Sequence, residues 1–149
     1  MNSDPEKELL YAKKAAYRIL AYADNTEAML RAKLARRGFS ADAISAAITE
    51  LRASGALDEQ RMLQSRQAYL VETKKYGKRR AIMELLRTGF PRELVARADW
   101  SDFDFVAICA QVIARAGGLD KKLYTSLLRR GYSPAEIKAA AALVAEEEQ

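Results

Sequence analysis

Basic residues crowd into one short stretch near the middle of this sequence. Five cations occupy seven consecutive positions, namely Lys74, Lys75, Lys78, Arg79 and Arg80. Like charges this close repel one another, so the cluster favours an anionic partner over a purely structural role. Ammonium and guanidinium groups bind phosphates and carboxylates. The cluster therefore predicts a contact site for nucleic acid or for an acidic protein surface.

Two further groups of basic residues stand at the ends of predicted helices. Lys33, Arg36 and Arg37 lie at helical spacing on one face, and Arg129 and Arg130 occupy the corresponding place later in the chain. Cations near a helix C-terminus are favoured by the helix dipole, which is a structural reason for them. We include both groups in the predicted contact surface, with this structural role as the alternative.

The net positive charge of the chain comes from its middle. The chain of 149 residues has a formal net charge of +5. Residues 61–97, which include Arg87, hold ten basic and three acidic residues, so this segment carries +7 and the remainder −2. Such an asymmetry concerns the partners of a protein rather than its fold. Arg87 is therefore added to the predicted contact surface.

Residue types suited to acid–base, nucleophilic or metal chemistry are scarce. The sequence has no His and one cysteine, Cys109, which excludes disulfides within the chain and the common Cys/His zinc sites. Cys109 lies in the apolar run 105–113, where a cysteine is usually a small buried side chain. The glycines stand at predicted helix ends rather than in a phosphate-binding loop. We expect no enzyme, cofactor or metal.

The composition is that of a helical protein. Hydrophobic residues make up 50% and charged residues 30%, while Pro numbers 3 and Gly 7, which predicts an all-α fold with almost no sheet. No apolar run approaches the roughly 20 residues that span a bilayer. With its single cysteine, the chain is expected in the cytoplasm and away from membranes. The absence of a sustained heptad pattern predicts a monomer.

One local pattern occurs three times. Gly38, Gly89 and Gly131 each have a leucine four residues before them and an aromatic residue directly after, and they lie 51 and 42 residues apart. A glycine can take the left-handed conformation that ends a helix, and the aromatic residue can fold back onto the last turn. Ser40 and Ser133 then suit the first position of a following helix. Each copy predicts a helix, a turn and a second helix.

A longer stretch with helical periodicity precedes each copy and predicts a first helix in 6–23, 58–76 and 101–116. Asp58 and Ser101 are predicted to cap the second and third of these. Three helices in three units give nine. The chain is therefore predicted to be a tandem array of three three-helix repeats that forms an elongated, curved helical repeat protein, with boundaries at 1–54, 55–99 and 100–149.

Three aromatic residues lie close to the basic segment. Tyr69 and Tyr76 flank the five-cation cluster and could stack on bases or anchor a protein interface, although the spacing of Tyr69 also fits a core position. Trp100 stands before the third unit and is predicted to pack between the second and third units.

The stretch 51–90 resembles the central part of the RecX family. Family members have a Gly-x-Leu-Asp-Asp/Glu turn before a helix, and a later glycine followed by basic residues, Ile, Leu and Gly-Ile/Phe. The matching residues here are Gly55, Leu57, Asp58, Glu59 and Arg61, then Gly77, Arg80, Ile82, Leu85 and Gly89. Residues 26–51 and 120–143 fit the flanking units of the family. Glu59 replaces the second Asp of the turn, and residues 23–27 depart from the family's Arg-x-x-Ser-Glu pattern.

The resemblance implies a small regulator that binds the RecA filament in recombinational DNA repair and the SOS response. It would inhibit or modulate filament assembly, ATP hydrolysis and strand exchange, and some family members also contact DNA. Two alternatives follow from the residues themselves. One is a free-standing module that binds single- or double-stranded DNA through helix-turn-helix pairs and cations. The other is a helical adaptor that binds an acidic helix or tail of another protein.

Overall fold

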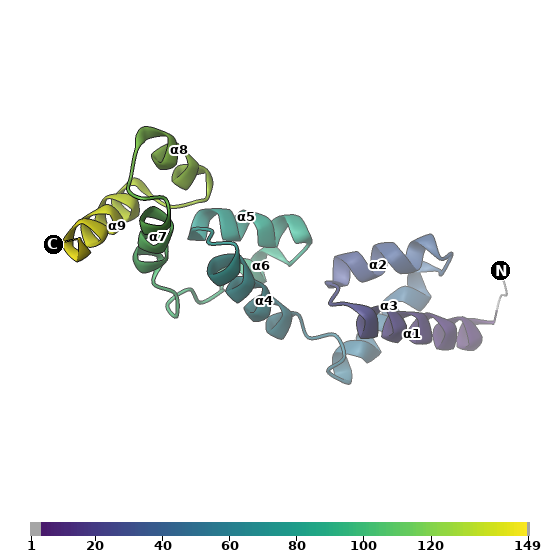
Figure 1. The fold of residues 1–149 in the computed structure, drawn as a ribbon. Coiled ribbons are helices and arrows are strands. Elements are labelled where there is room, and N and C mark those ends of the chain that lie inside the picture. Colours follow the sequence, from purple (N-terminus) through teal and green to yellow (C-terminus); the bar gives the residue numbers. More distant parts are fainter. Residues whose placement is uncertain (1–3, 149) are drawn as a thin grey trace. The chain divides into compact units, whose positions relative to one another are not determined.

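The computed structural model describes residues 4–148, and every regular element in that range is helical (Figure 1). Nine α-helices and one π-helical turn, but no strand, occur in the described part of the chain. This confirms the prediction of an all-α helical repeat protein. No helix within residues 4–148 combines the length and the apolar character that a membrane crossing requires.

The chain divides into two compact units. The first contains the residues up to Leu63 together with Thr88–Pro91, and the second contains Gln64–Arg87 and the residues from Arg92 onward. Helices of the first unit are α1 (Pro5–Tyr22), α2 (Glu27–Arg36), α3 (Ala41–Ala53) and the beginning of α4 (Glu59–Ala68). The boundaries proposed for three repeats stay a prediction.

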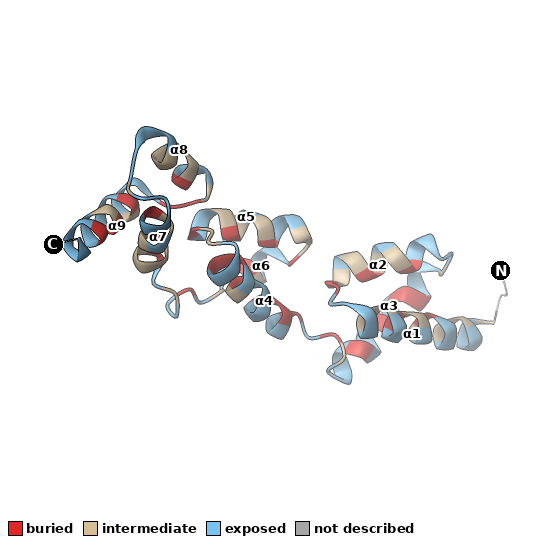
Figure 2. Cartoon of the chain, in the orientation of Figure 1, coloured by how far each residue is buried: buried red, intermediate tan, exposed pale blue. Residues whose placement is uncertain are grey.

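Small side chains lie where α1 meets α3 in the first unit. Helix α1 packs mainly against α3, and its Ala12 is fully buried beside Ala43 and Ala47, with Leu9 and Phe39 covering them. Alanine at these positions lets two helix backbones approach closely, and it costs no side-chain entropy. The buried positions of each helix are shown in red in Figure 2.

The beginning of α4 is held to the first unit by a buried carboxylate. Glu59 is 5% exposed. Its Oε1 accepts a hydrogen bond from Arg52 Nη2 (2.7 Å), and its Oε2 accepts one from the backbone N–H of Glu27 (3.2 Å). The same Arg52 donates to the Glu27 side chain, which lowers the pKa of that carboxyl. Glu59, the second acidic residue of the Gly-x-Leu-Asp-Glu turn, therefore joins α2, α3 and α4.

The second unit contains the remaining elements: the rest of α4, the π-helical turn η1 (Tyr69–Thr73), α5 (Lys78–Thr88), α6 (Arg92–Ala96), α7 (Phe105–Arg115), α8 (Lys121–Arg129) and α9 (Pro134–Glu147). Helix α7 packs mainly against α9. Trp100 lies against Phe103 and Phe105, with ring centroids 6.2 Å apart in each pair. Trp100 is therefore part of an apolar cluster before α7.

Most of the predicted helix ends are confirmed. Gly38, Gly89 and Gly131 have φ values of 90°, 110° and 99°, as expected for residues that end helices in the left-handed conformation. Ser40 caps α3, and Ser133 forms a capping box with Glu136 at the start of α9.

The predicted continuous helix 58–76 is wrong in its second half. Helix α4 ends at Ala68 and continues as the π-turn, in which the N–H of Lys74 donates to the carbonyl of Tyr69. Lys75 then takes a left-handed conformation with φ 59° and ends the segment. Helical periodicity cannot distinguish a π-turn from an α-turn, since the two differ by one residue in their hydrogen bonds.

The predicted helix cap at Ser101 is also wrong, and of the two alternatives for Tyr69 the core position does not hold. Helix α7 begins at Phe105 and is capped by Asp104, whose Oδ1 accepts from the N–H of Ala107, rather than by Ser101. The Ser101 N–H instead donates to Asp99 Oδ1, which forms a separate turn. Tyr69 is not a core residue, because it is 39% exposed and lies beneath the guanidinium of Arg66.

Candidate functional site

The start of α5 and the end of α8 meet through direct backbone contact. The N–H of Gly77 donates to the carbonyl of Arg130 at 2.7 Å, and the Tyr132 hydroxyl donates to the carbonyl of Lys75 at 2.7 Å. A Cβ at Gly77 would lie 2.5 Å from the carbonyl carbon of Gly131, so no larger residue fits. This junction places the basic first turn of α5 beside the basic last turn of α8.

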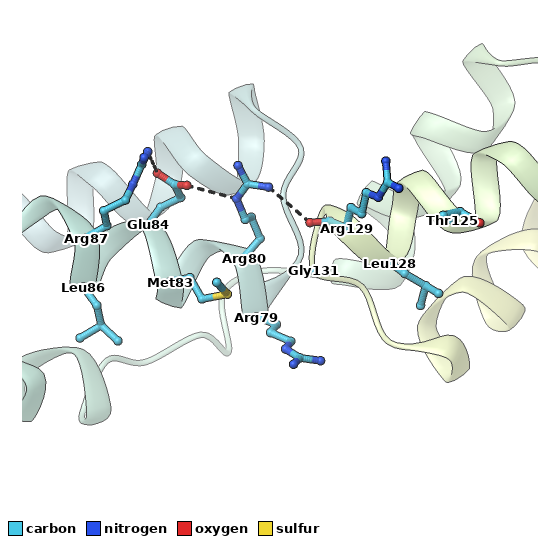
Figure 3. A pocket seen from close by; sticks show the side chains of 10 residues that line it. All are labelled: Arg79, Arg80, Met83, Glu84, Leu86, Arg87, Thr125, Leu128, Arg129 and Gly131. Carbon is cyan, nitrogen blue, oxygen red and sulfur yellow. Dashed lines mark hydrogen bonds and ion pairs between the residues drawn. The ribbon is translucent and has the colours of Figure 1, made fainter.

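The two helices line a groove with a volume of about 770 Å³ (Figure 3). Its lining combines cations with apolar side chains, and all of it belongs to the second unit: Arg79, Arg80, Met83, Glu84, Leu86 and Arg87 of α5, Thr125, Leu128 and Arg129 of α8, and Gly131. A second hollow of about 720 Å³ shares Arg79, Leu128 and Gly131 with the first and extends toward Pro134. The concave surface therefore continues past the junction.

A chain of hydrogen bonds runs along the groove (Figure 3). Glu84 accepts from Arg80 Nε at 3.1 Å and from Arg87 Nη2 at 2.7 Å, and Arg80 Nη1 also donates to the carbonyl of Arg129 at 3.4 Å. The hydrogen bond from Arg87, with a further one from Arg80, lowers the pKa of the Glu84 carboxyl. Two arginines thus face the one carboxylate that lines the groove, and the lining keeps a net positive charge.

The structure brings four of the predicted contact residues together in this groove. They are Arg79, Arg80, Arg87 and Arg129, which come from segments more than forty residues apart in the chain. Lys78 is exposed and lines the neighbouring second hollow. Arg80 has a partly structural role, since its guanidinium also lies 4.8 Å from the centroid of the Tyr76 ring.

Other predicted contact residues lie elsewhere or are engaged in the fold. Lys75 Nζ donates to Gln111 Oε1 at 3.1 Å. Lys74 and Arg130 are the C-cap residues that directly follow η1 and α8. Lys33, Arg36 and Arg37 belong to the first unit. There the Lys33 Nζ donates to the buried Asn25 at 2.6 Å, while Arg36 and Arg37 are exposed.

Sequence reasoning missed the apolar part of the groove. Met83 is 59% exposed, and Leu86 and Leu128 are each 39% exposed. The sequence of α5 did indicate exposed apolar residues. Ile82, Met83, Leu85 and Leu86 together occupy a wider arc of the helix surface than the single stripe that packs against a core. Only Leu85 of these four is fully buried, so the surplus apolar side chains face the surface.

Cys109 is placed as a structural residue. Its side chain is fully buried in α7, and burial raises the pKa of the thiol to about 11. At neutral pH such a thiol is protonated and unreactive. The prediction that Cys109 is a small buried side chain is therefore confirmed.

Comparison with known proteins adds independent information on the family. Residues 12–51 match the family model of the first three-helix domain of RecX. The structure is similar to the crystal structure of RecX from Lactobacillus salivarius, with a TM-score of 0.84 and 18% sequence identity, over 95% of this chain and 99% of that chain. No curated protein matches the sequence. The sequence match lies in the first unit, and the likeness in fold extends over both units.

Proposed function

We propose that this chain is a member of the RecX family, on the match of residues 12–51 to the first three-helix domain of RecX and on its fold, and that it is a non-enzymatic regulator of the RecA nucleoprotein filament. It binds the filament in the cytoplasm as a monomer. By binding, it inhibits or modulates filament assembly, ATP hydrolysis and strand exchange. Recombinational DNA repair and the SOS response are the processes affected.

The observation that carries this proposal is the match to the first three-helix domain of RecX, and we propose the groove of the second unit as the contact surface. The groove has four arginines and one carboxylate, and that carboxylate is bound to two of the arginines. An ordinary structural ion-pair network would balance its charges, whereas this lining leaves guanidinium groups for a partner. Arg79, Arg87 and Arg129 are exposed, and of these Arg79 and Arg129 form no ion pair with another described residue.

The proposed mechanism is differential binding to one state of the filament. A helical repeat protein offers contact residues on successive units, so a single chain can contact neighbouring RecA protomers like a clamp. A ligand shifts an equilibrium only by its preference for one state. Preferential binding to one arrangement of protomers would stabilise that arrangement or block its conversion into the active one.

Binding to the filament can be tested by co-sedimentation. RecA is assembled on single-stranded DNA with a slowly hydrolysed ATP analogue, and this protein is added at physiological salt. We expect it to sediment with the filament and to stay in the supernatant with the same DNA alone. Equal binding to naked DNA would contradict the proposal and favour the free-standing DNA-binding module, which would also show a steep salt dependence.

A further inference from the structure

The groove between α5 and α8 has an apolar floor that the protein itself leaves uncovered. Met83 and Leu86 lie one helical turn apart on α5, and Leu128 of α8 is the apolar side chain on the other wall. Their exposures of 59%, 39% and 39% are high for side chains grouped in one hollow. Grouped exposed apolar residues with a polar rim are typical of a binding surface.

Four of the five charged side chains that line this groove are cations. Arg79 and Arg129 are exposed and form no ion pair with another described residue. Among the described residues, Arg87 forms an ion pair only with Glu84. A complementary ligand therefore carries carboxylates at its edges and apolar side chains in its middle. An amphipathic protein segment has this arrangement, because its apolar residues recur at three- and four-residue spacing and its acidic residues flank them.

We propose that this groove binds an acidic amphipathic segment of a partner protein. The apolar stripe of the segment lies on Met83, Leu86 and Leu128, and its carboxylates bind Arg79 and Arg129. The identity of the partner rests on the proposed function. To that function the inference adds the chemistry of the filament surface that the groove would contact.

The dimensions of the walls suit a short helical segment. Helix α5 has 11 residues and α8 has 9, which correspond to lengths of roughly 16 and 14 Å. These lengths match about three turns of a bound helix. The second hollow, which begins at the shared residues Arg79 and Leu128, extends this surface toward Pro134 and Glu136.

Nucleic acid fits the same lining less well. Single-stranded nucleic acid is bound by cations combined with exposed aromatic rings on which the bases stack. None of the ten residues that line the groove is aromatic, and Tyr132 of the second hollow is 2% exposed. Aliphatic side chains such as Met83 and Leu86 have no favourable contact with phosphate groups. The groove therefore selects carboxylate-bearing protein over phosphate-bearing nucleic acid.

The test uses the full chain and a dye-labelled peptide of about 16 residues, with leucines at helical spacing flanked by glutamates. Binding is measured by fluorescence anisotropy, beside an oligothymidylate of equal net charge. We expect Leu128→Asp, which adds a carboxylate to the apolar floor, to weaken peptide binding at least about tenfold. Oligothymidylate should bind much more weakly than the peptide, to the wild-type protein and to the variant alike.

A matched control is available in the same unit. Leu143 of α9 is also 39% exposed and lies outside both hollows, so Leu143→Asp should leave peptide binding unchanged. The proposal is overturned if wild-type protein fails to bind the peptide, if Leu128→Asp binds it as tightly as Leu143→Asp does, or if wild-type protein binds oligothymidylate as tightly as the peptide. The assay contains no RecA, so its failure is distinct from a failure to bind the filament.

Discussion

The double variant Arg79→Glu, Arg129→Glu is expected to bind the RecA filament at least about 100-fold more weakly than the wild-type protein. A hydrogen bond from a charged group contributes about 1.5 kcal/mol or more, so two lost contacts amount to about 3 kcal/mol, and each tenfold change in affinity is about 1.4 kcal/mol. Reversal of the charge adds repulsion of acidic partner groups. The measurement is the co-sedimentation titration, with circular dichroism to verify helical content.

The control variant makes the same change in net charge elsewhere in the second unit. Arg115 lies in the last turn of α7, as Arg129 does in α8, and both Arg115 and Lys138 of α9 are exposed. Arg115→Glu, Lys138→Glu should change filament affinity by less than about threefold, since exposed charges away from a contact are screened by salt. Equal losses in the two double variants would show that overall charge, and not the groove, governs binding.

Replacement of Gly77 by alanine is expected to destabilise the second unit strongly. The added Cβ would lie 2.5 Å from the Gly131 carbonyl carbon and 2.6 Å from the Tyr132 nitrogen, which are backbone atoms that cannot rotate away. Overpacking of this kind and loss of the Gly77–Arg130 hydrogen bond together cost about 2–4 kcal/mol. A decrease in Tm of roughly 5–15 °C should follow in thermal unfolding.

Gly117→Ala provides the comparison for this effect. Gly117 has φ 85°, and no atom lies within 4 Å of the position that its Cβ would take. Its replacement by alanine should lower the free energy of unfolding by only about 1–2 kcal/mol, which is the strain of an alanine in the left-handed conformation. If Gly77→Ala were no less stable than Gly117→Ala, the backbone junction between α5 and α8 would not hold the two helices together as described.

Local signals in the sequence predicted much of the fold. The glycines that end α2, α5 and α8 each precede an aromatic residue, and the capping residues Ser40 and Ser133 precede α3 and α9. These features act within a few residues of the chain, so they can be recognised without knowledge of tertiary contacts. The π-turn after α4 was missed because it depends on the hydrogen bond from Lys74 to Tyr69 rather than on residue type.

The groove could be predicted only in part. Its cations were recognised from their clustering, but the contact of Arg80 with the carbonyl of Arg129 depends on the close approach of Gly77 and Gly131. Neither glycine indicates its partner in the sequence. The apolar floor was missed because an apolar residue on a helix is normally assigned to the core, and only the surplus of such residues on α5 indicated otherwise.

Regulation of the RecA filament by this protein can be tested by its effect on ATP hydrolysis. The measurement is ATP hydrolysis by RecA on single-stranded DNA, with this protein titrated from well below one molecule per RecA protomer. Strong inhibition at substoichiometric amounts is predicted, because one bound molecule that contacts neighbouring protomers would affect more than one of them. Unchanged hydrolysis at equimolar protein would contradict the claim that the protein regulates the RecA filament.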